Sequence, residues 1–101
     1  MKQEQEDGLV RLALEGEMTI YTAHRIKQRL LDALAVGQGL EADLSQVSEF
    51  DSVGLQLLLL ARAESFRAGK AVRFVGASPV VDEVVRLCGL TSLFDQPQFA
   101  L

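Results

Sequence analysis

The chain has 101 residues, of which 49% are hydrophobic and 24% charged, proportions that suit one small globular domain. Its 14 acidic residues outnumber its 10 basic ones, which gives a net charge of −4. Because lysines and arginines form no cluster, we expect no binding to nucleic acid or to an anionic membrane surface. No apolar run reaches the roughly 18 residues of a membrane-spanning helix, so no direct membrane insertion is expected. The polar, acidic N-terminus is unlike a signal peptide and favours a cytoplasmic location.

The pattern of apolar residues divides the chain into three parts. Residues 1–7 are predicted to be a flexible lead, either frayed or leading into a sheet edge. Residues 8–95 are predicted to be a folded domain and residues 96–101 a C-terminal tail. Alternating apolar residues predict a half-buried strand over 8–15. A turn at 15–17 and a short extended piece at 18–20 follow.

The first predicted helix begins after Thr22, whose hydroxyl is suited to cap free backbone N–H groups. Ile26, Leu30 and Leu34 recur every four residues, which is typical of an amphipathic helix, and Gly37 is its predicted end. A second strand is predicted over residues 40–44.

A polar loop over residues 45–52 leads from this strand into a second helix over 53–68. Five of the six residues from 55 to 60 are leucine, so this helix is either buried on most of its surface or in contact with a partner. A third strand over 71–75 and a third helix over 78–89 complete the domain, the last helix opening on a serine and a proline.

This order of strands and helices predicts an α/β fold, with parallel strands joined by right-handed crossovers and helices packed on the sheet. In such folds, ligands and functional loops gather at the carboxyl ends of the strands. The polar loop over 45–52 leaves a strand at that end, and it ends in Ser52.

Ser52 has two interpretations. A serine at the start of a helix is a common N-cap and needs no further function. It is also a candidate phosphoacceptor, since a phosphate there would meet free backbone N–H groups at the positive end of the helix. That phosphate would add about −1.5 to −2 charge beside Glu49 and Asp51, which a docked partner surface would not tolerate.

The residues of this loop resemble a known signature. The pattern Asp43-Leu44-Ser45-x-Val47-x-x-Phe50-Asp51-Ser52-x-Gly54-Leu55 is similar to that of STAS domains, the family of bacterial anti-sigma factor antagonists. Further similarities occur in the family's order, over roughly residues 8–95. These are Leu14-x-Gly16-Glu17, Thr22-Ala23, Gly69-Lys70, Ser78-Pro79 and Cys88-Gly89-Leu90. The resemblance implies a small sandwich in which helices cover a mixed β-sheet.

The resemblance also implies a function and a site. In that family a partner serine kinase phosphorylates the position of Ser52. The unphosphorylated form binds the kinase and frees a sigma factor. Phosphorylation breaks this complex, and a phosphatase restores it. Asp51 would orient the hydroxyl, Gly54 would let a partner approach the backbone, and the first helical turn, with Val53 and Leu55, would contact the partner. Val53 departs from the family, where many antagonists carry a second serine or threonine.

A second reading of the resemblance is a constitutive adaptor. Some relatives are the small cytoplasmic subunit of a lipid-transporting ABC complex, and others accompany chemosensory signalling proteins. In such an adaptor Ser52 would be a cap and a contact residue that is never phosphorylated.

An enzyme is the interpretation that the sequence favours least. Ser52 lies on a strand–turn–helix, but Phe50 stands where a nucleophile elbow needs glycine. His24 is the only histidine, expected on a helix surface, and Cys88 is the only cysteine, expected to be buried in an apolar helical pattern. One histidine and one cysteine provide no metal-ligand spacing, and no glycine-rich phosphate loop is present. We therefore expect no catalytic residues, no metal and no cofactor.

Overall fold

The computed structural model describes residues 2–6 and 8–94, and over these residues it contains one four-stranded mixed sheet with helices. Strand β1 is antiparallel to β2, whereas β2, β3 and β4 run parallel in that order. The strands are β1 (Lys2–Glu6), β2 (Leu9–Met18), β3 (Gly39–Phe50) and β4 (Ala71–Val75). The helices are α1 (Ala23–Val36), α2 (Ser52–Arg67), α3 (Pro79–Leu87) and the short 3-10 helix η1 (Thr91–Leu93). The predicted α/β fold is confirmed.

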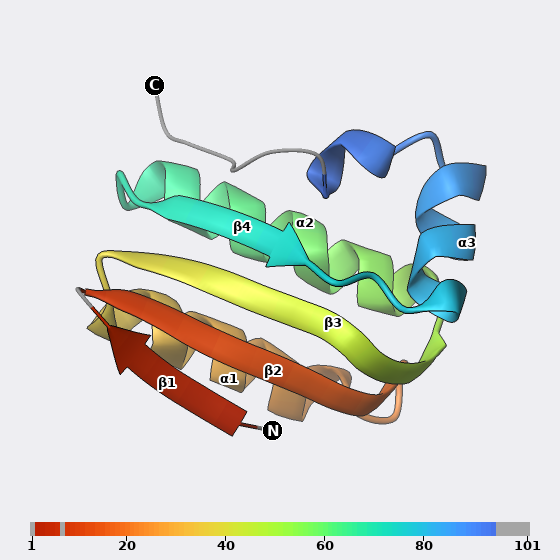
Figure 1. Ribbon diagram of the computed structural model, residues 1–101, viewed down its shortest axis with the longest axis horizontal. Helices are drawn as coiled ribbons and strands as arrows, with labels where there is room; N and C mark the ends of the chain where they lie inside the picture. Colours follow the sequence, from red (N-terminus) through yellow and green to blue (C-terminus); the bar gives the residue numbers. More distant parts are fainter. Residues whose placement is uncertain (1, 7, 95–101) are drawn as a thin grey trace.

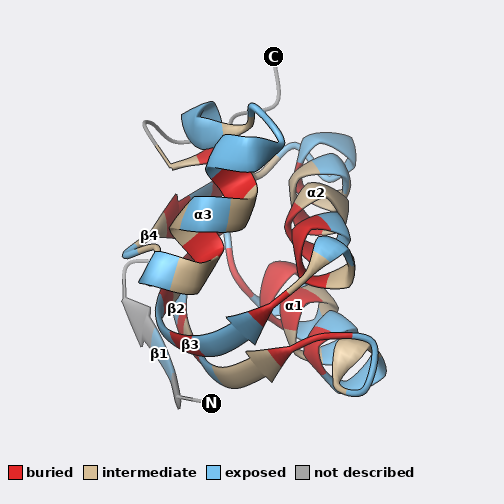
Figure 2. Cartoon of the chain, turned by 90° about the vertical axis from the view of Figure 1, so that its right-hand side faces the viewer, coloured by how far each residue is buried: buried red, intermediate tan, exposed pale blue. Residues whose placement is uncertain are grey.

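Both long helices, α1 and α2, pack on the same face of the sheet, and α3 lies at the end toward which β3 and β4 point (Figure 1). The buried residues, red in Figure 2, occur on the facing sides of the sheet and these helices and form one apolar core. The stripe predicted for α1 is buried, and so are Leu55, Leu57 and Leu58 of the leucine-rich stretch. Leu59 and Leu60 are half-buried, so this stretch belongs mainly to the core. No helix in the described part of the chain is long and apolar enough to cross a membrane.

The N-terminal segment differs from the prediction of a flexible lead. Residues 2–6 form edge strand β1, in which Gln3 pairs with Leu12 and Gln5 with Val10 on β2. A flexible lead was expected because a run of polar residues has no apolar alternation, whereas this strand pairs through its backbone, with Glu4 opposite Arg11 on β2. A polar edge strand also discourages association with other chains. The predicted tail over 96–101 lies outside the described residues.

Strand β2 includes residues 15–17, which were predicted to be a turn, and the first residue of the extended piece predicted over 18–20. Gly16, with a positive φ of 75°, lies inside the strand, which ends at Met18. The pairing with β3 shifts register between Gly16 and Glu17, so this glycine marks a β-bulge. The turn itself lies later, where the backbone N–H of Thr22 donates to the carbonyl of Thr19 at 3.1 Å.

Strand β3 is longer than predicted, because residues 45–50 are strand and not loop. The pairing of β3 with β2 shifts register twice, and each shift gives β3 one extra residue. The first extra residue lies between the partners of Ala13 and Glu15, and the second between the partners of Gly16 and Glu17. Each extra residue changes which side chains face the core. As a result Leu44, Val47 and Phe50, spaced by three, are all buried. That spacing breaks strict alternation, which is why the pattern resembled a loop.

The start of α2 packs tightly against the ends of β2 and β3. A Cβ added to Gly54 would lie 2.7 Å from the Phe50 ring and 2.8 Å from the Met18 carbonyl oxygen. Both distances are far below van der Waals contact. Glycine at position 54 therefore allows helix and sheet to approach closely inside the chain.

Gly54→Ala is expected to lower the free energy of unfolding by about 1–3 kcal/mol, since the added methyl group overpacks this contact. At an open helical position the same change would raise the free energy of unfolding by about 1 kcal/mol. The sign of the change in stability therefore distinguishes a tightly packed position from an open one. Urea denaturation measures it, with Gln56→Ala as the control at an exposed position of the same helix. A Gly54→Ala variant as stable as the parent would contradict the contact.

Candidate functional site

The predicted site lies where β3 passes into α2, at the carboxyl ends of the parallel strands (Figure 1). The pairing of Met18 with Phe50 ends β2 and β3 at the same edge of the sheet. The turn from β2 into α1 is therefore next to the turn from β3 into α2. This placement agrees with the expectation that the functional loop lies at the carboxyl edge.

Asp51, and not Ser52, is the N-cap of α2. Its carboxylate oxygen Oδ1 accepts hydrogen bonds from the backbone N–H groups of Val53 at 2.9 Å and Gly54 at 3.3 Å. Its backbone is extended, and its carbonyl accepts the first helical bond, from Leu55 N at 3.1 Å. The interpretation of Ser52 as a cap is therefore wrong. The carboxylate, expected to orient the serine hydroxyl, instead holds the helix start.

Ser52 is the first residue of α2, and its side chain is exposed. Within residues 2–6 and 8–94, its hydroxyl has no hydrogen-bond partner. The amides of Val53 and Gly54, expected to be free for a phosphate, already bind the Asp51 carboxylate. A phosphate on Ser52 would therefore face a carboxylate of the same sign and not those two amides.

The five predicted contact residues differ in exposure. Ser52 is exposed and Asp51 and Val53 are half-buried, so these three have atoms open to solvent. Gly54 and Leu55 are buried, and Leu55 is only 7% exposed. The close approach that Gly54 allows is internal, to Phe50 and Met18, and not to a partner.

Two exposed residues beside this site were not predicted from the sequence. Ile20 is 68% exposed and Tyr21 90% exposed in the turn between β2 and α1. The available signal was an apolar pair directly before Thr22, where a turn is ordinarily polar. Thr22 stands at the predicted N-cap position, but its hydroxyl bonds the 17–19 segment and caps no helical N–H group.

The two residues considered for chemistry lie apart from any cluster in the described chain. His24 is exposed in the first turn of α1, as expected. Cys88 is exposed, and its predicted burial is wrong, because α3 ends at Leu87 and the chain turns away from the buried side of Val81 and Val85. No group of three or more histidine, cysteine or carboxylate side chains suited to a metal ion occurs among the described residues.

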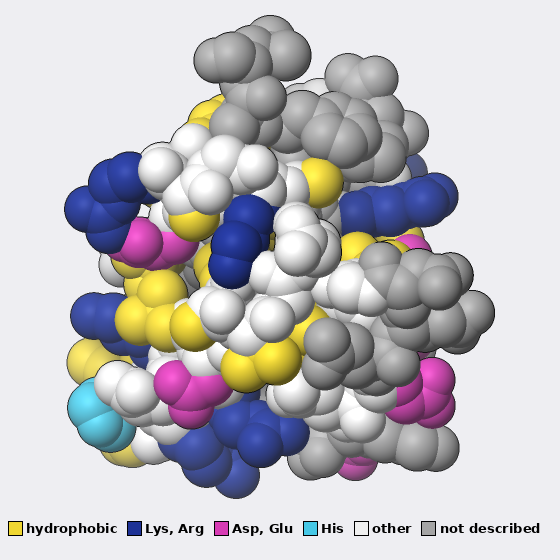
Figure 3. Space-filling model, turned by 90° about the vertical axis from the view of Figure 1, so that its left-hand side faces the viewer, with side chains coloured by type: hydrophobic (Ala, Val, Ile, Leu, Met, Phe, Trp, Pro, Cys, Tyr) yellow, Lys and Arg dark blue, Asp and Glu magenta, His cyan; other side chains and the backbone are white. Residues whose placement is uncertain are grey.

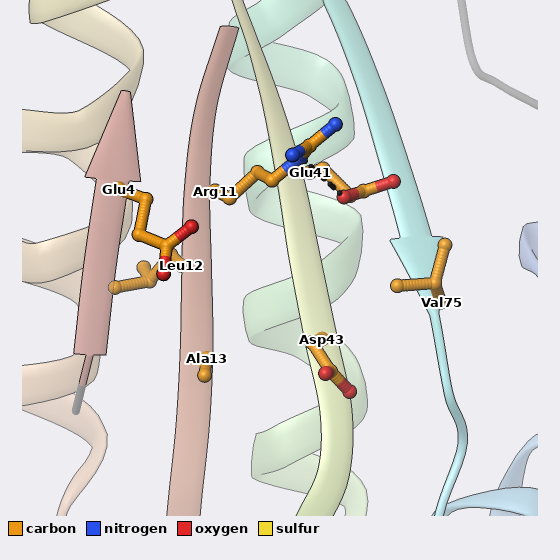
Figure 4. A pocket seen from close by; sticks show the side chains of 7 residues that line it. All are labelled: Glu4, Arg11, Leu12, Ala13, Glu41, Asp43 and Val75. Carbon is orange, nitrogen blue, oxygen red and sulfur yellow. Dashed lines mark ion pairs between the residues drawn. The ribbon is translucent and has the colours of Figure 1, made fainter. Parts of the chain in front are cut away.

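The helix-free face of the sheet carries a shallow hollow of about 180 Å³ (Figure 4). Across it, Glu4 lies opposite Arg11 and Arg11 opposite Glu41, with 3.1 Å between Arg11 Nε and Glu41 Oε2. Such exposed pairs of opposite charge contribute about 0–1 kcal/mol each. The residues around the hollow are Glu4, Arg11, Leu12, Ala13, Glu41, Asp43 and Val75. None of them belongs to the predicted site.

Asp51→Ala is expected to lower the free energy of unfolding by about 0.5–2 kcal/mol, because two helical amides lose their acceptor. Asp51→Asn keeps an acceptor oxygen and is expected to restore most of this loss. Thermal denaturation of the three proteins at one pH measures both effects. Equal losses for alanine and asparagine would show that the cap is not the source of the stability.

Comparison with known proteins identifies the fold and the family. A family model described as "Mlab, STAS domain" matches residues 1–95. An anti-sigma factor antagonist from Mycobacterium paratuberculosis is 26% identical, with a TM-score of 0.80 over 93% of this chain and 80% of that one. The anti-sigma factor antagonist SpoIIAA in its unphosphorylated form is 21% identical, with a TM-score of 0.76 over 92% of this chain and 84% of that one. SpoIIAA of Bacillus has also been solved in the phosphorylated form.

A sulfate transporter family protein from Wolinella succinogenes is 16% identical, with a TM-score of 0.70 over 88% of this chain and 73% of that one. At 21% and 16% identity, the likenesses to SpoIIAA and to this transporter protein concern the fold alone. No curated protein matches the chain. The family model spans nearly the whole chain, and it confirms the resemblance that the loop signature carried. The chain belongs to the STAS domain family.

Proposed function

We propose that this chain is a phospho-switchable protein-binding module of the anti-sigma factor antagonist type. Its Ser52 turn docks a regulatory serine kinase, and phosphorylation of Ser52 by that kinase releases the complex. The module works in the cytoplasm and performs no reaction of its own. The family membership and the antagonist structures with the same fold support this proposal.

The observation that carries the proposal is the Ser52 hydroxyl, which is exposed at the start of α2 and takes no part in capping it. Because Asp51 performs the cap, the hydroxyl is available to a kinase without disturbing the helix. A structural serine would instead be occupied by the bonds that hold the turn.

Asp51 also explains why a phosphate would act on the partner and not on the fold. The cap amides are already taken, so a phosphate on Ser52 would gain no bond from them. It would carry about −1.5 to −2 charge close to the Asp51 carboxylate and the exposed Glu49. A partner surface that buries a neutral hydroxyl would then have to bury a dianion, which is costly.

The geometry gives no support to a nucleophilic role for Ser52. An activated serine requires a base within hydrogen-bond reach of its oxygen. In the part of the chain that the structure describes, no side chain bonds to the Ser52 hydroxyl.

The alternative is a fixed adaptor that binds its partner permanently and is not phosphorylated. The observation that favours it is Val53, a half-buried apolar residue where many antagonists have a second hydroxyl. The same fold also occurs in a sulfate transporter family protein. Affinity co-purification from the native cell distinguishes the two functions. A serine kinase in the eluate with phosphate on Ser52 supports the switch, whereas a transporter or chemosensory protein with unmodified Ser52 supports the adaptor.

Ser52→Asp is expected to weaken binding of the co-purified kinase at least tenfold, because it places a permanent charge at the acceptor position. Ser52→Ala is expected to keep the affinity within about threefold, since the hydroxyl makes no bond in the fold. Isothermal titration calorimetry with the purified kinase measures both.

Ser48→Asp provides the matched control, because Ser48 is also exposed and lies four residues earlier on β3. It introduces the same charge outside the acceptor position and is expected to bind like the parent. If both aspartate variants lost affinity equally, general charge repulsion would account for the effect and the site-specific switch would be wrong.

A further inference from the structure

Two large apolar side chains are exposed to solvent at one turn of the molecule. Ile20 is 68% and Tyr21 90% exposed, and they are consecutive residues between β2 and α1. A buried aromatic side chain removes about 150–250 Å² from water, so this pair holds substantial unused apolar area. The fold itself does not explain why these two positions are apolar.

The turn that carries this pair is held rigidly from both sides. Thr22 Oγ1 donates to the Glu17 carbonyl at 2.8 Å and accepts from Thr19 N at 3.1 Å. Thr19, itself buried, donates its hydroxyl to the Glu17 carboxylate and accepts from Tyr21 N at 3.4 Å. The backbone of the pair is thus fixed before any partner arrives, which lowers the entropy cost of binding through these side chains.

This turn adjoins the start of α2. Met18, two residues before Ile20, pairs with Phe50, and Phe50 is two residues before Ser52. The Met18 carbonyl oxygen also lies 2.8 Å from the position of a Cβ on Gly54. The pair and the Ser52 hydroxyl therefore flank the same contact between helix and sheet, at one edge of the molecule.

The charges on the two turns indicate what kind of surface covers this edge. The segments 17–25 and 49–56 together contain three carboxylates, on Glu17, Glu49 and Asp51, against one arginine, Arg25. An anionic lipid surface or a nucleic acid would require the opposite balance. An apolar pair within a mainly acidic rim matches a folded protein that offers an apolar pocket with basic residues around it.

We propose that Ile20 and Tyr21 are the apolar anchor of the surface that docks the partner protein of Ser52. The inference rests on the proposed function and extends it, because it names the residues that supply the binding energy. Ser52 then controls a contact whose affinity comes from the neighbouring turn. Exposed aromatic anchors beside near-neutral contacts are typical of binding hot spots.

Photo-crosslinking in the native cell tests the shared surface. Benzoylphenylalanine is placed at position 21, at exposed position 56 in the first turns of α2, and at position 36 as the control. Val36 is 62% exposed but is the last residue of α1. That helix ends on the left of Figure 1, which is the side of the molecule that faces the viewer in Figure 3. We expect positions 21 and 56 to capture the same serine kinase and position 36 to capture none.

The outcomes separate this inference from the proposed function. If position 56 captures a serine kinase that position 21 does not, the anchor is wrong and the function stands. If both positions capture one protein that is not a kinase, the shared surface stands and the phospho-switch is wrong. Adducts from position 21 only with lipid, or only with a second copy of the chain, would overturn the inference.

Affinity measurements with the captured protein then test the energetic role. Tyr21→Ala is expected to weaken binding at least tenfold and Ile20→Ala several-fold, while Tyr21→Phe keeps most of the affinity. Val36→Ala, which removes a similar exposed apolar side chain, is expected to leave it unchanged. Because Ile20 and Tyr21 are exposed, thermal stability should not change. Affinities of the Tyr21→Ala and Val36→Ala variants that agree within twofold would refute the anchor.

Discussion

The parallel pairing of β2 with β3 is the constraint on which the rest of the structure depends. It brings both strands to the same edge of the sheet, where Met18 and Phe50 form the last pair. From this edge the chain continues from β2 into α1 and from β3 into α2. Gly54 then lets the first turn of α2 rest directly on this pair. Because three elements meet at one tight contact, the exposed residues on either side of it, Tyr21 and Ser52, have fixed positions relative to each other.

Much of the fold was predictable because its core obeys simple periods. The apolar stripe of α1 reflects burial, and Gly69, with a φ of 69° after the end of α2, reflects backbone geometry; a short window of sequence records both. The polar strand β1 was not predictable, since its pairing is made by the backbone and leaves no side-chain pattern. Residues 45–50 were mistaken for a loop because two bulges place Leu44, Val47 and Phe50 on one face at a spacing of three.

The location of the candidate site between β3 and α2 was predictable from the sequence, but which of its residues caps the helix was not. Asp51 and Ser52 are both favourable N-caps, and the sequence contains nothing that chooses between them. The choice depends on where β3 ends, and the bulges extend β3 to Phe50. Asp51 is then the residue with extended backbone just before the helix, so its carboxylate reaches the amides and Ser52 is placed outward. Likewise, the exposure of Ile20 and Tyr21 follows from the extension of β2 to Met18.

Because the cap of α2 is a carboxylate, it changes how the helix start would interact with a negative group on Ser52. At a helix start capped by a neutral serine, a phosphate would be attracted by the open amides and the positive end of the helix dipole. Here Asp51 already places a negative charge at that end and occupies the amides of Val53 and Gly54. The helix therefore has less stabilisation to offer a second anion, which remains directed to solvent or to a partner. A phosphate on Ser52 would therefore gain no bond from the amides of Val53 and Gly54 and would add a second negative charge beside Asp51.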